Sequence, residues 1–246
     1  MTDAGKAGDA FRVVGTPRFG GILIVADHAA NRVPDDIDLG IDPELMNEHI
    51  ALDIGVAGIA EAMAAREGTA ALLGNVSRLV CDTNRTESDP AAIPEVSDGQ
   101  PIPGNVGIDR QARLDLFHRP FHARLTDLLE STPPALTLIL HSYTPCLASK
   151  PGDKRPWHCG LLYDNDDRGA RAAFPLLEAE GLIVGDQLPY SGKVYNAAIE
   201  RHVESEGRPY LYIEIRQDLI EDPAGQAHWA ERLARICSRI ALALNE

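Results

Sequence analysis

Several short apolar runs along the chain end abruptly in polar side chains that are common in catalysis. The three clearest runs, each with the polar residues that follow it, are 21–26 before Asp27 and His28, 136–140 before His141, and 210–213 before Glu214. Runs of this length and composition are typical of buried strands. In open α/β sheets, functional groups gather just beyond the carboxyl ends of the strands. We therefore expect two imidazoles and a carboxylate, far apart in sequence, to meet at one edge of a sheet.

Stretches with helical periodicity alternate with these strands. Apolar residues at helical spacing predict amphipathic helices over 42–66, beginning at Asp42-Pro43-Glu44, and over 110–130, where Pro120 interrupts the pattern. A last helix is expected after the strand at 210–215, and one or two strands are expected within 70–80. This alternation of strands and helices predicts an α/β sandwich.

Nothing in the sequence divides the chain into separate domains, so residues 1–246 are expected to form a single domain. Residues 1–10 are small and polar and are expected to be frayed. Residues 86–109 hold four prolines and three glycines with little periodicity, which predicts a long surface loop. Whether this loop closes over a site is open at this point.

Charge and cysteine content narrow the range of partners. The formal net charge is −14, which argues against nucleic acid or an anionic membrane as a partner, because both require a basic surface. The chain is 44% hydrophobic, which is ordinary for a globular protein. No stretch approaches the roughly 20 apolar residues of a membrane span, and the N-terminus has no apolar signal segment. The four cysteines form no CxxC pair and indicate reduced thiols in a cytoplasmic protein. The oligomeric state is not indicated.

The first candidate site is the turn after the run 21–26. His28 and Asn31, three residues apart, are able to bind one metal ion from a tight turn, and His141 would supply a second imidazole. Taken alone, each histidine is equally typical of a structural residue bonded to the backbone. Asp53 is a third candidate, either as a ligand or as a carboxylate that orients His28.

Glu214 lies inside an apolar run, where a carboxylate is costly to bury unless it is paired or bound to a ligand. One interpretation is an ion pair with Arg216, which points to the same face of a strand. The other is a general base that takes a proton from an attacking water.

Four arginines lie near these segments and would suit an anionic substrate: Arg32, Arg78, Arg85 and Arg216. Arg85 is able to form a bidentate bond to a substrate carboxylate, with Asn84 beside it and Asp82 holding an arginine in place. A surface salt-bridge cluster is the alternative for this segment. His118 and His122 have the spacing of a helical zinc pair but lack the HExxH glutamate, so we interpret them mainly as helix surface, with His122 reaching the edge of the site.

At these residues the chain resembles the N-formylglutamate amidohydrolase family. The resemblance covers about residues 18 to 240. It is carried by these motifs: Asp-His-Ala-Ala-Asn-Arg-Val-Pro (27–34), Ser-Arg-Leu-Val-Cys-Asp-Thr-Asn-Arg (77–85), His141-Ser142, Pro-Tyr-Ser-Gly (189–192), Glu-Arg-His (200–202) and Glu-Ile-Arg-Gln-Asp-Leu-Ile (214–220). Ala29-Ala30 departs from the Ser-Gly that is more common in the family. The resemblance implies a three-layer αβα sandwich with a mixed, mainly parallel central sheet, as in zinc-dependent exopeptidases of the phosphorylase/hydrolase-like fold.

The resemblance also implies roles for individual residues. His28 and His141 correspond to metal-binding histidines, and Asn31 takes a position where related exopeptidases use glutamate. Glu214 corresponds to the catalytic glutamate. Asn84 and Arg85 correspond to the pair that holds the substrate carboxylate.

We therefore expect a metal-dependent amidohydrolase, with zinc as the cofactor, that cleaves a small anionic N-acyl amino acid. Glu214 would be the base, Arg78 or Arg85 would stabilise the oxyanion, and Arg216 would lie among the substrate-binding residues. The alternatives are a carboxypeptidase-like enzyme, an amidase for another N-acyl compound, and a relative that binds metal or ligand without catalysis.

Overall fold

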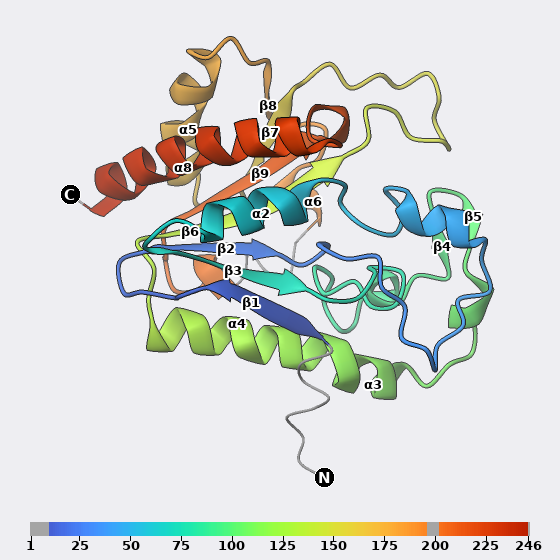
Figure 1. The fold of residues 1–246 in the computed structure, drawn as a ribbon. Helices are drawn as coiled ribbons and strands as arrows, with labels where there is room; N and C mark the ends of the chain where they lie inside the picture. The colour runs from blue at the N-terminus through green and yellow to red at the C-terminus, as the bar shows by residue number, and fades with distance from the viewer. Residues whose placement is uncertain (1–9, 196–201, 246) are drawn as a thin grey trace.

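A seven-stranded sheet forms the centre of the computed structural model, which describes residues 10–195 and 202–245 (Figure 1). The strand order is β1-β3-β2-β6-β9-β7-β8. In chain order the strands are β1 (Phe11–Gly15), β2 (Ile22–Ala26), β3 (Thr69–Gly74), β6 (Leu136–Tyr143), β7 (Cys159–Leu162), β8 (Val184–Asp186) and β9 (Tyr210–Arg216). The four neighbours β3, β2, β6 and β9 run parallel, whereas β1 and β7 pair antiparallel with β3 and β9.

Helices cover both faces of this sheet (Figure 1). On one face lie α2 (Val56–Ala64), α5 (Arg168–Glu178) and α8 (Pro223–Asn245). On the other lie α3 (Arg110–Arg113) and α4 (Arg119–Ser131), and α6 (Gly192–Tyr195) is a single turn. The predicted α/β class with a mixed, mainly parallel central sheet is confirmed.

The central strands are buried because helices cover the sheet on both sides, which is usual for parallel sheets. Every residue of β6 is buried, and the apolar side chains of β2 and β9 join the main core. A second apolar cluster joins Ile102, which lies in the segment 86–109, to Phe117 outside that segment. Through this cluster, the segment 86–109 packs against the rest of the protein.

The segment 86–109 contains more order than its composition predicted. It holds a small hairpin of β4 (Val96–Ser97) and β5 (Gln100–Pro101) and the 3-10 turns Pro90–Ala92 and Pro103–Asn105. Its Asp98 accepts hydrogen bonds from the backbone amides of Ala148 and Ser149, so the hairpin is tied to a second loop. The expectation of frayed residues 1–10 falls almost wholly outside the described residues.

The prediction of one continuous helix over 42–66 was wrong. The structure has a 3-10 helix at Pro43–Asn47 and begins α2 only at Val56. Gly55 lies between them with φ +85°, and a Cβ there would come within 2.2 Å of the carbonyl oxygen of Ile220. The chain therefore leaves the helical path over 48–55, and this irregular stretch carries Asp53.

The helix predicted over 110–130 exists, but a π-helical turn at Leu114–His118 joins α3 to α4. Pro120 has no backbone N–H to donate to the preceding turn, and a widened turn accommodates that loss without ending the helix. The edge strand β1 was not predicted. Among the described residues, no helix combines the length and the apolarity that crossing a membrane requires.

Candidate active site

Three neighbouring strands bring the predicted site residues together at their carboxyl ends. Asp27 and His28 directly follow β2, and His141 lies in the adjacent strand β6. Glu214 of β9 is the register partner of His141. The sequence-based expectation that two imidazoles and a carboxylate meet at one sheet edge is therefore matched by the structure.

Backbone contacts set the turn that carries Asp27 and His28. A Cβ at Gly74, in β3, would lie 1.8 Å from the carbonyl oxygen of Asp27, so only glycine allows this close approach. The backbone N–H of Asp53 donates to the carbonyl of His28 at 3.0 Å. This bond holds the irregular stretch before α2 against the turn after β2.

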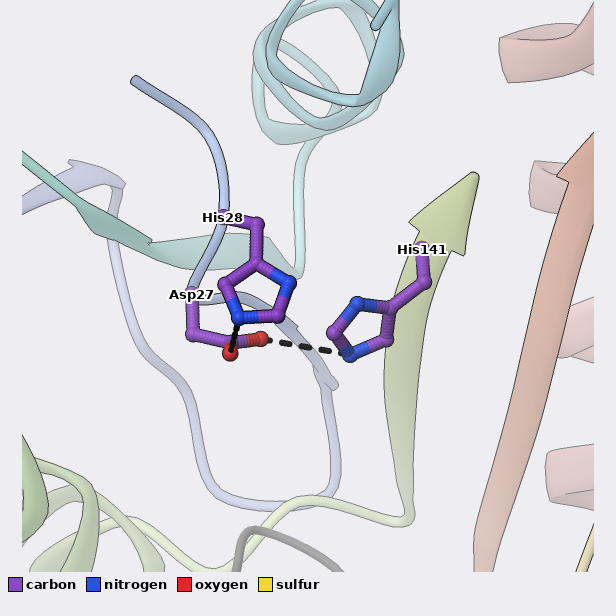
Figure 2. Close-up of side chains that lie close together, drawn as sticks. All are labelled: Asp27, His28 and His141. Carbon is purple, nitrogen blue, oxygen red and sulfur yellow. Dashed lines mark ion pairs between the residues drawn. The ribbon is translucent and has the colours of Figure 1, made fainter. Parts of the chain in front are cut away.

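Asp27, His28 and His141 form a buried group whose side chains point toward one another (Figure 2). Each offers one ligand atom, and these atoms lie within 4.8 Å of one another. The carboxylate of Asp27 lies between the rings, with Oδ2 3.0 Å from His28 Nε2 and Oδ1 3.2 Å from His141 Nε2. A carboxylate and two imidazoles are the ligand types of a catalytic zinc site.

The environment of Asp27 fits a bound cation. Its side chain is fully buried, and its oxygens contact the two imidazoles without hydrogen bonds of good geometry. A buried carboxylate without such bonds is costly unless it binds a metal ion or a counter-charge. The 3.0 Å and 3.2 Å separations are shorter than the roughly 3.3–3.6 Å between tetrahedral ligand atoms that each lie about 2.0–2.2 Å from one zinc ion.

Two further carboxylates contact the imidazoles from outside this group. Asp53 Oδ2 accepts the N–H of His141 Nδ1 at 2.7 Å, which leaves His141 Nε2 facing Asp27. Asp82 Oδ1 lies 2.8 Å from His28 Nε2. A carboxylate that bonds the other ring nitrogen, as Asp53 does for His141, is a recurrent partner of metal ligands. Asp82 instead contacts the same Nε2 of His28 as Asp27 does. Asp53 was expected either to bind the metal or to orient His28; its Oδ2 contacts both rings, at 2.7 Å from His141 Nδ1 and 3.4 Å from His28 Nδ1.

Arg78 balances these outer carboxylates. Its guanidinium donates to Asp53 Oδ1 at 3.2 Å and to Asp82 Oδ2 at 3.0 Å. Asp82 is also held by the backbone, because it accepts the N–H of Asn84. Both Nη atoms of Arg78 are therefore bonded to carboxylates of the protein itself.

The site as a whole favours positive charge. Burial and the nearby Arg78 lower the pKa of His28, but Asp27, Asp82 and Asp53 outweigh them and hold that pKa well above its usual value. Burial also opposes charge on His141, yet Asp27 and Asp53 raise its pKa. The same carboxylates that stabilise a proton on each ring would stabilise a divalent cation that replaces those protons.

Glu214 differs from the other acids of the site. Burial raises its pKa to about 7, even though His141 and Arg78 pull in the opposite direction. A carboxyl group that titrates near neutral pH is suited to accept and return a proton during a reaction. The burial that its apolar strand predicted is therefore what raises the pKa of Glu214.

A cavity of about 150 Å³ opens onto the group. Its lining includes residues from both the metal side and the predicted substrate side: His28, His141, Glu214, Arg78, Asn84, Arg85, Tyr190 and Tyr212. A larger cleft of about 1030 Å³ elsewhere on the molecule is lined by none of the predicted site residues. The small cavity is therefore the one with the chemistry of an active site.

Asn84 and Arg85 line this cavity beside the candidate metal group. Asn84 Nδ2 donates to the hydroxyl of Tyr212 at 3.1 Å and lies 3.3 Å from His141 Nε2. Arg85 lines the cavity, and its Nε is 4.0 Å from Asp82 Oδ2. An amide and a guanidinium beside the candidate metal group suit a substrate that carries a carboxylate.

Comparison with known proteins identifies the family of this chain. The family model described as N-formylglutamate amidohydrolase matches residues 20–221. The chain belongs to the N-formylglutamate amidohydrolase family. No curated protein matches the chain.

Two solved structures cover the chain almost completely. A gene product of Agrobacterium tumefaciens superposes with a TM-score of 0.87 and 28% identity, covering 100% of this chain and 99% of that one. The N-formylglutamate amidohydrolase from Ralstonia eutropha superposes with a TM-score of 0.72 and 19% identity, covering 96% and 98%. At 19% identity, the likeness to the Ralstonia eutropha structure shows a shared fold. Membership of the family supports a hydrolase.

Two residues expected at the site of this family member lie apart from the cavity. Asn31 is partly exposed, and its amide donates to Asn47 Oδ1 at 3.3 Å. Arg216 is bonded to Asp218, at 2.7 Å, and not to Glu214. Neither side chain is among those that line the cavity.

Two positions near the site were missed or misjudged from sequence. Asp27 was not named as a ligand, and the only local signal for it is its place beside His28 at the end of a strand. His118 was expected at the surface but is only 5% exposed. Of the family motif at 200–202, Glu200 and Arg201 lie outside the described residues.

Proposed function

We propose that this protein is a metal-dependent amidohydrolase that cleaves the amide bond of a small N-acyl amino acid, with N-formylglutamate as the family precedent. The observation that carries the proposal is the buried carboxylate of Asp27, which lies between the Nε2 atoms of His28 and His141 without hydrogen bonds of good geometry. Glu214, with a pKa raised to about 7 by burial, lines the same cavity.

Asp27, His28 and His141 would hold the metal, for which zinc is the candidate that best suits this ligand set. A divalent ion there would act as a Lewis acid that polarises the amide carbonyl and makes an attacking water more acidic. Asp53, which bonds Nδ1 of His141, would keep that imidazole oriented with Nε2 toward the site.

The protein's own groups account for the proton transfers. Glu214 takes a proton from the attacking water as its oxygen bonds to the acyl carbon. It then delivers that proton to the amide nitrogen as the carbon–nitrogen bond breaks. The products are the free carboxylic acid, which is formate for a formyl group, and the free amino acid.

Arg85 and Asn84 would bind the substrate carboxylate. Arg85 lines the cavity beside the candidate metal group, and Asn84 is fixed by its bond to Tyr212. Arg78, with both arms bonded to Asp53 and Asp82, supports those carboxylates, which favours Arg85 over Arg78 as the residue that contacts substrate. The cavity volume of about 150 Å³ favours a single acylated amino acid over a peptide.

The test is a metal analysis followed by a substrate series. Wild type and His141→Ala, purified without chelator and dialysed against trace zinc, are compared by elemental analysis. About one zinc per wild-type chain, lost in the variant, is the expected result. Hydrolysis of N-formyl-L-glutamate should then be abolished by chelation and restored by zinc.

The same series separates the alternatives. Fast cleavage of peptides with slow cleavage of N-formylglutamate would identify a carboxypeptidase-like enzyme. Zinc binding without hydrolysis of any acyl amino acid would identify a relative that binds metal without catalysis. Absence of metal from both proteins would refute the proposed mechanism.

A further inference from the structure

Three histidines outside the candidate metal group lie behind the segment that carries Asn84 and Arg85. His118 and His122 are one helical turn apart, at the end of the π-helical turn and in α4, with ring centroids 4.3 Å apart. The ring of His202 lies edge to edge with that of His122, with nearly parallel planes and centroids 5.0 Å apart. We call these three residues the histidine bridge.

Each end of the segment Thr83–Arg85 is bonded to this bridge through a backbone carbonyl. His122 Nε2 lies 2.8 Å from the carbonyl oxygen of Thr83. His118 Nε2 lies 2.7 Å from the carbonyl oxygen of Arg85. The two histidines therefore hold the backbone on both sides of Asn84.

The carbonyl oxygens determine where the protons lie. A carbonyl oxygen only accepts, so His118 and His122 must each carry a proton on Nε2. Burial, followed by the neighbouring His118 and His202, lowers the pKa of His122 to about 3, so its ring is neutral and its Nδ1 carries no proton.

This assignment fixes the third ring as well. His122 Nδ1 lies 2.8 Å from His202 Nε2, and because Nδ1 can only accept, His202 must donate from Nε2. His202 Nδ1 lies 3.4 Å from Thr126 Oγ1, whose hydroxyl is able to donate to it. The hydrogen bonds thus run in one direction, from Thr126 through His202 and His122 to the carbonyl of Thr83.

The segment held in this way reaches the active site directly. Asn84 donates to Tyr212 and lies beside His141, and Arg85 lines the cavity. A shift of this backbone by even a fraction of an ångström would move both side chains relative to the candidate metal group, and such misplacement lowers binding and rate. A π-helical turn that ends on His118 is also a feature often found at functional sites.

We propose that His118, His122 and His202 are positioning residues that fix the segment Thr83–Arg85 for substrate binding by holding its backbone carbonyls. The proposal rests on the proposed function for the role of Arg85 and Asn84. None of the three histidines lines the cavity, so they act through the segment and not by contact with substrate.

Paired substitutions at His122 test the hydrogen bond apart from the volume of the ring. His122→Phe keeps a ring but removes the donor to Thr83, whereas His122→Gln places an amide N–H near the position of Nε2. We expect His122→Phe to raise KM for the N-acyl amino acid about tenfold or more, because a buried carbonyl loses its partner. His122→Gln should remain within about threefold of wild type, and zinc content should be unchanged in both.

The pair His202→Phe and His202→Gln repeats the test at a half-buried position, in case His122→Phe does not fold. The phenylalanine variant removes the donor to His122 Nδ1, and the glutamine variant retains one. His228→Phe, an exposed histidine on α8, is the matched control that should leave KM unchanged. Equal effects of Phe and Gln, or no effect of either at both positions, would overturn the proposal.

Two measurements that need no turnover keep this proposal separate from the proposed function. Amide hydrogen exchange of a peptide spanning the segment 83–85 should be about tenfold faster in His122→Phe than in wild type or His122→Gln. A long-range hydrogen–nitrogen NMR spectrum of the wild type should show neutral rings with the proton on Nε2 for His122 and His202. A proton on Nδ1 of His122, or exchange that the variants do not change, refutes the positioning role even in a protein that hydrolyses nothing.

Discussion

Replacing Asp53 by asparagine removes one negative charge from behind the candidate metal group with almost no change in volume. In the structure, Asp53 Oδ2 accepts from His141 Nδ1 at 2.7 Å and from the backbone N–H of Ser142 at 3.3 Å. Its other oxygen accepts from Arg78 at 3.2 Å. The substitution therefore weakens the group that orients His141 and leaves Arg78 with less compensation.

The magnitude follows from the kind of bond that is lost. A hydrogen bond to a charged group contributes about 1.5–3 kcal/mol, and a neutral one about 0.5–1.5 kcal/mol. Asp53→Asn should thus weaken the hold on His141 by on the order of 1–2 kcal/mol, and the less compensated Arg78 adds repulsion against a cation. Loss of such an orienting partner typically lowers metal affinity about 10–100-fold, and we expect a loss in that range here.

The assay is a competition titration of zinc against a chromogenic chelator at neutral pH and fixed ionic strength. Asp222→Asn is the matched control, because Asp222 accepts from the backbone N–H of Gly225 at the start of α8, away from the cavity, and asparagine caps helices equally well. The control should bind zinc as wild type does. A zinc affinity of Asp53→Asn within about twofold of wild type would refute the orienting role.

The remaining predictions address the base, the substrate arginine and the core. Glu214→Gln should lower kcat at least about 100-fold while zinc content is retained. In the wild type, kcat/KM should rise with pH through an acidic limb at or below about 7, because Glu214 acts as a base only when deprotonated. A bound cation lowers the raised pKa of Glu214, which is why the limb is expected at or below that value. A flat profile would argue against this base. Arg85→Lys should raise KM about tenfold, since lysine cannot form the bidentate bond, and an unchanged KM would place the substrate carboxylate elsewhere. Leu138→Ala, fully buried in β6, should lower the free energy of unfolding by about 2–5 kcal/mol in urea denaturation, against almost no change for Leu242→Ala, which is 67% exposed.

Much of the fold was predictable because its central strands are continuous apolar runs. β2, β6 and β9 were expected from composition alone, and the residues after or within them, His28, His141 and Glu214, meet as predicted. The edge strand β1 was not predicted, because its half-buried residues give a weaker pattern than the buried strands. Edge strands satisfy only one row of backbone hydrogen bonds and need less apolar surface.

The helix predicted over 42–66 shows where periodicity misleads. Apolar spacing continued across 48–55, yet Gly55 adopts a left-handed conformation against Ile220, a contact more than a hundred residues distant in the chain. The same departure from helix brought Asp53 to His141. Arg216 lies outside the cavity for the opposite reason, because its neighbour Asp218 is close enough to bond it locally.

The sequence by itself determined the α/β class, the strands that carry the site, and the two histidines and the glutamate at their carboxyl ends. These features depend on apolar patterns within a few residues, which act through local geometry and burial. Only the tertiary structure decided that Asp27 faces both imidazoles, that Asp53 bonds His141 across 88 positions, and that Asp82 meets His28 across 54. Such pairings depend on how helices and loops pack around the sheet, and a charged side chain gives no local sign of the partner that packing will bring to it.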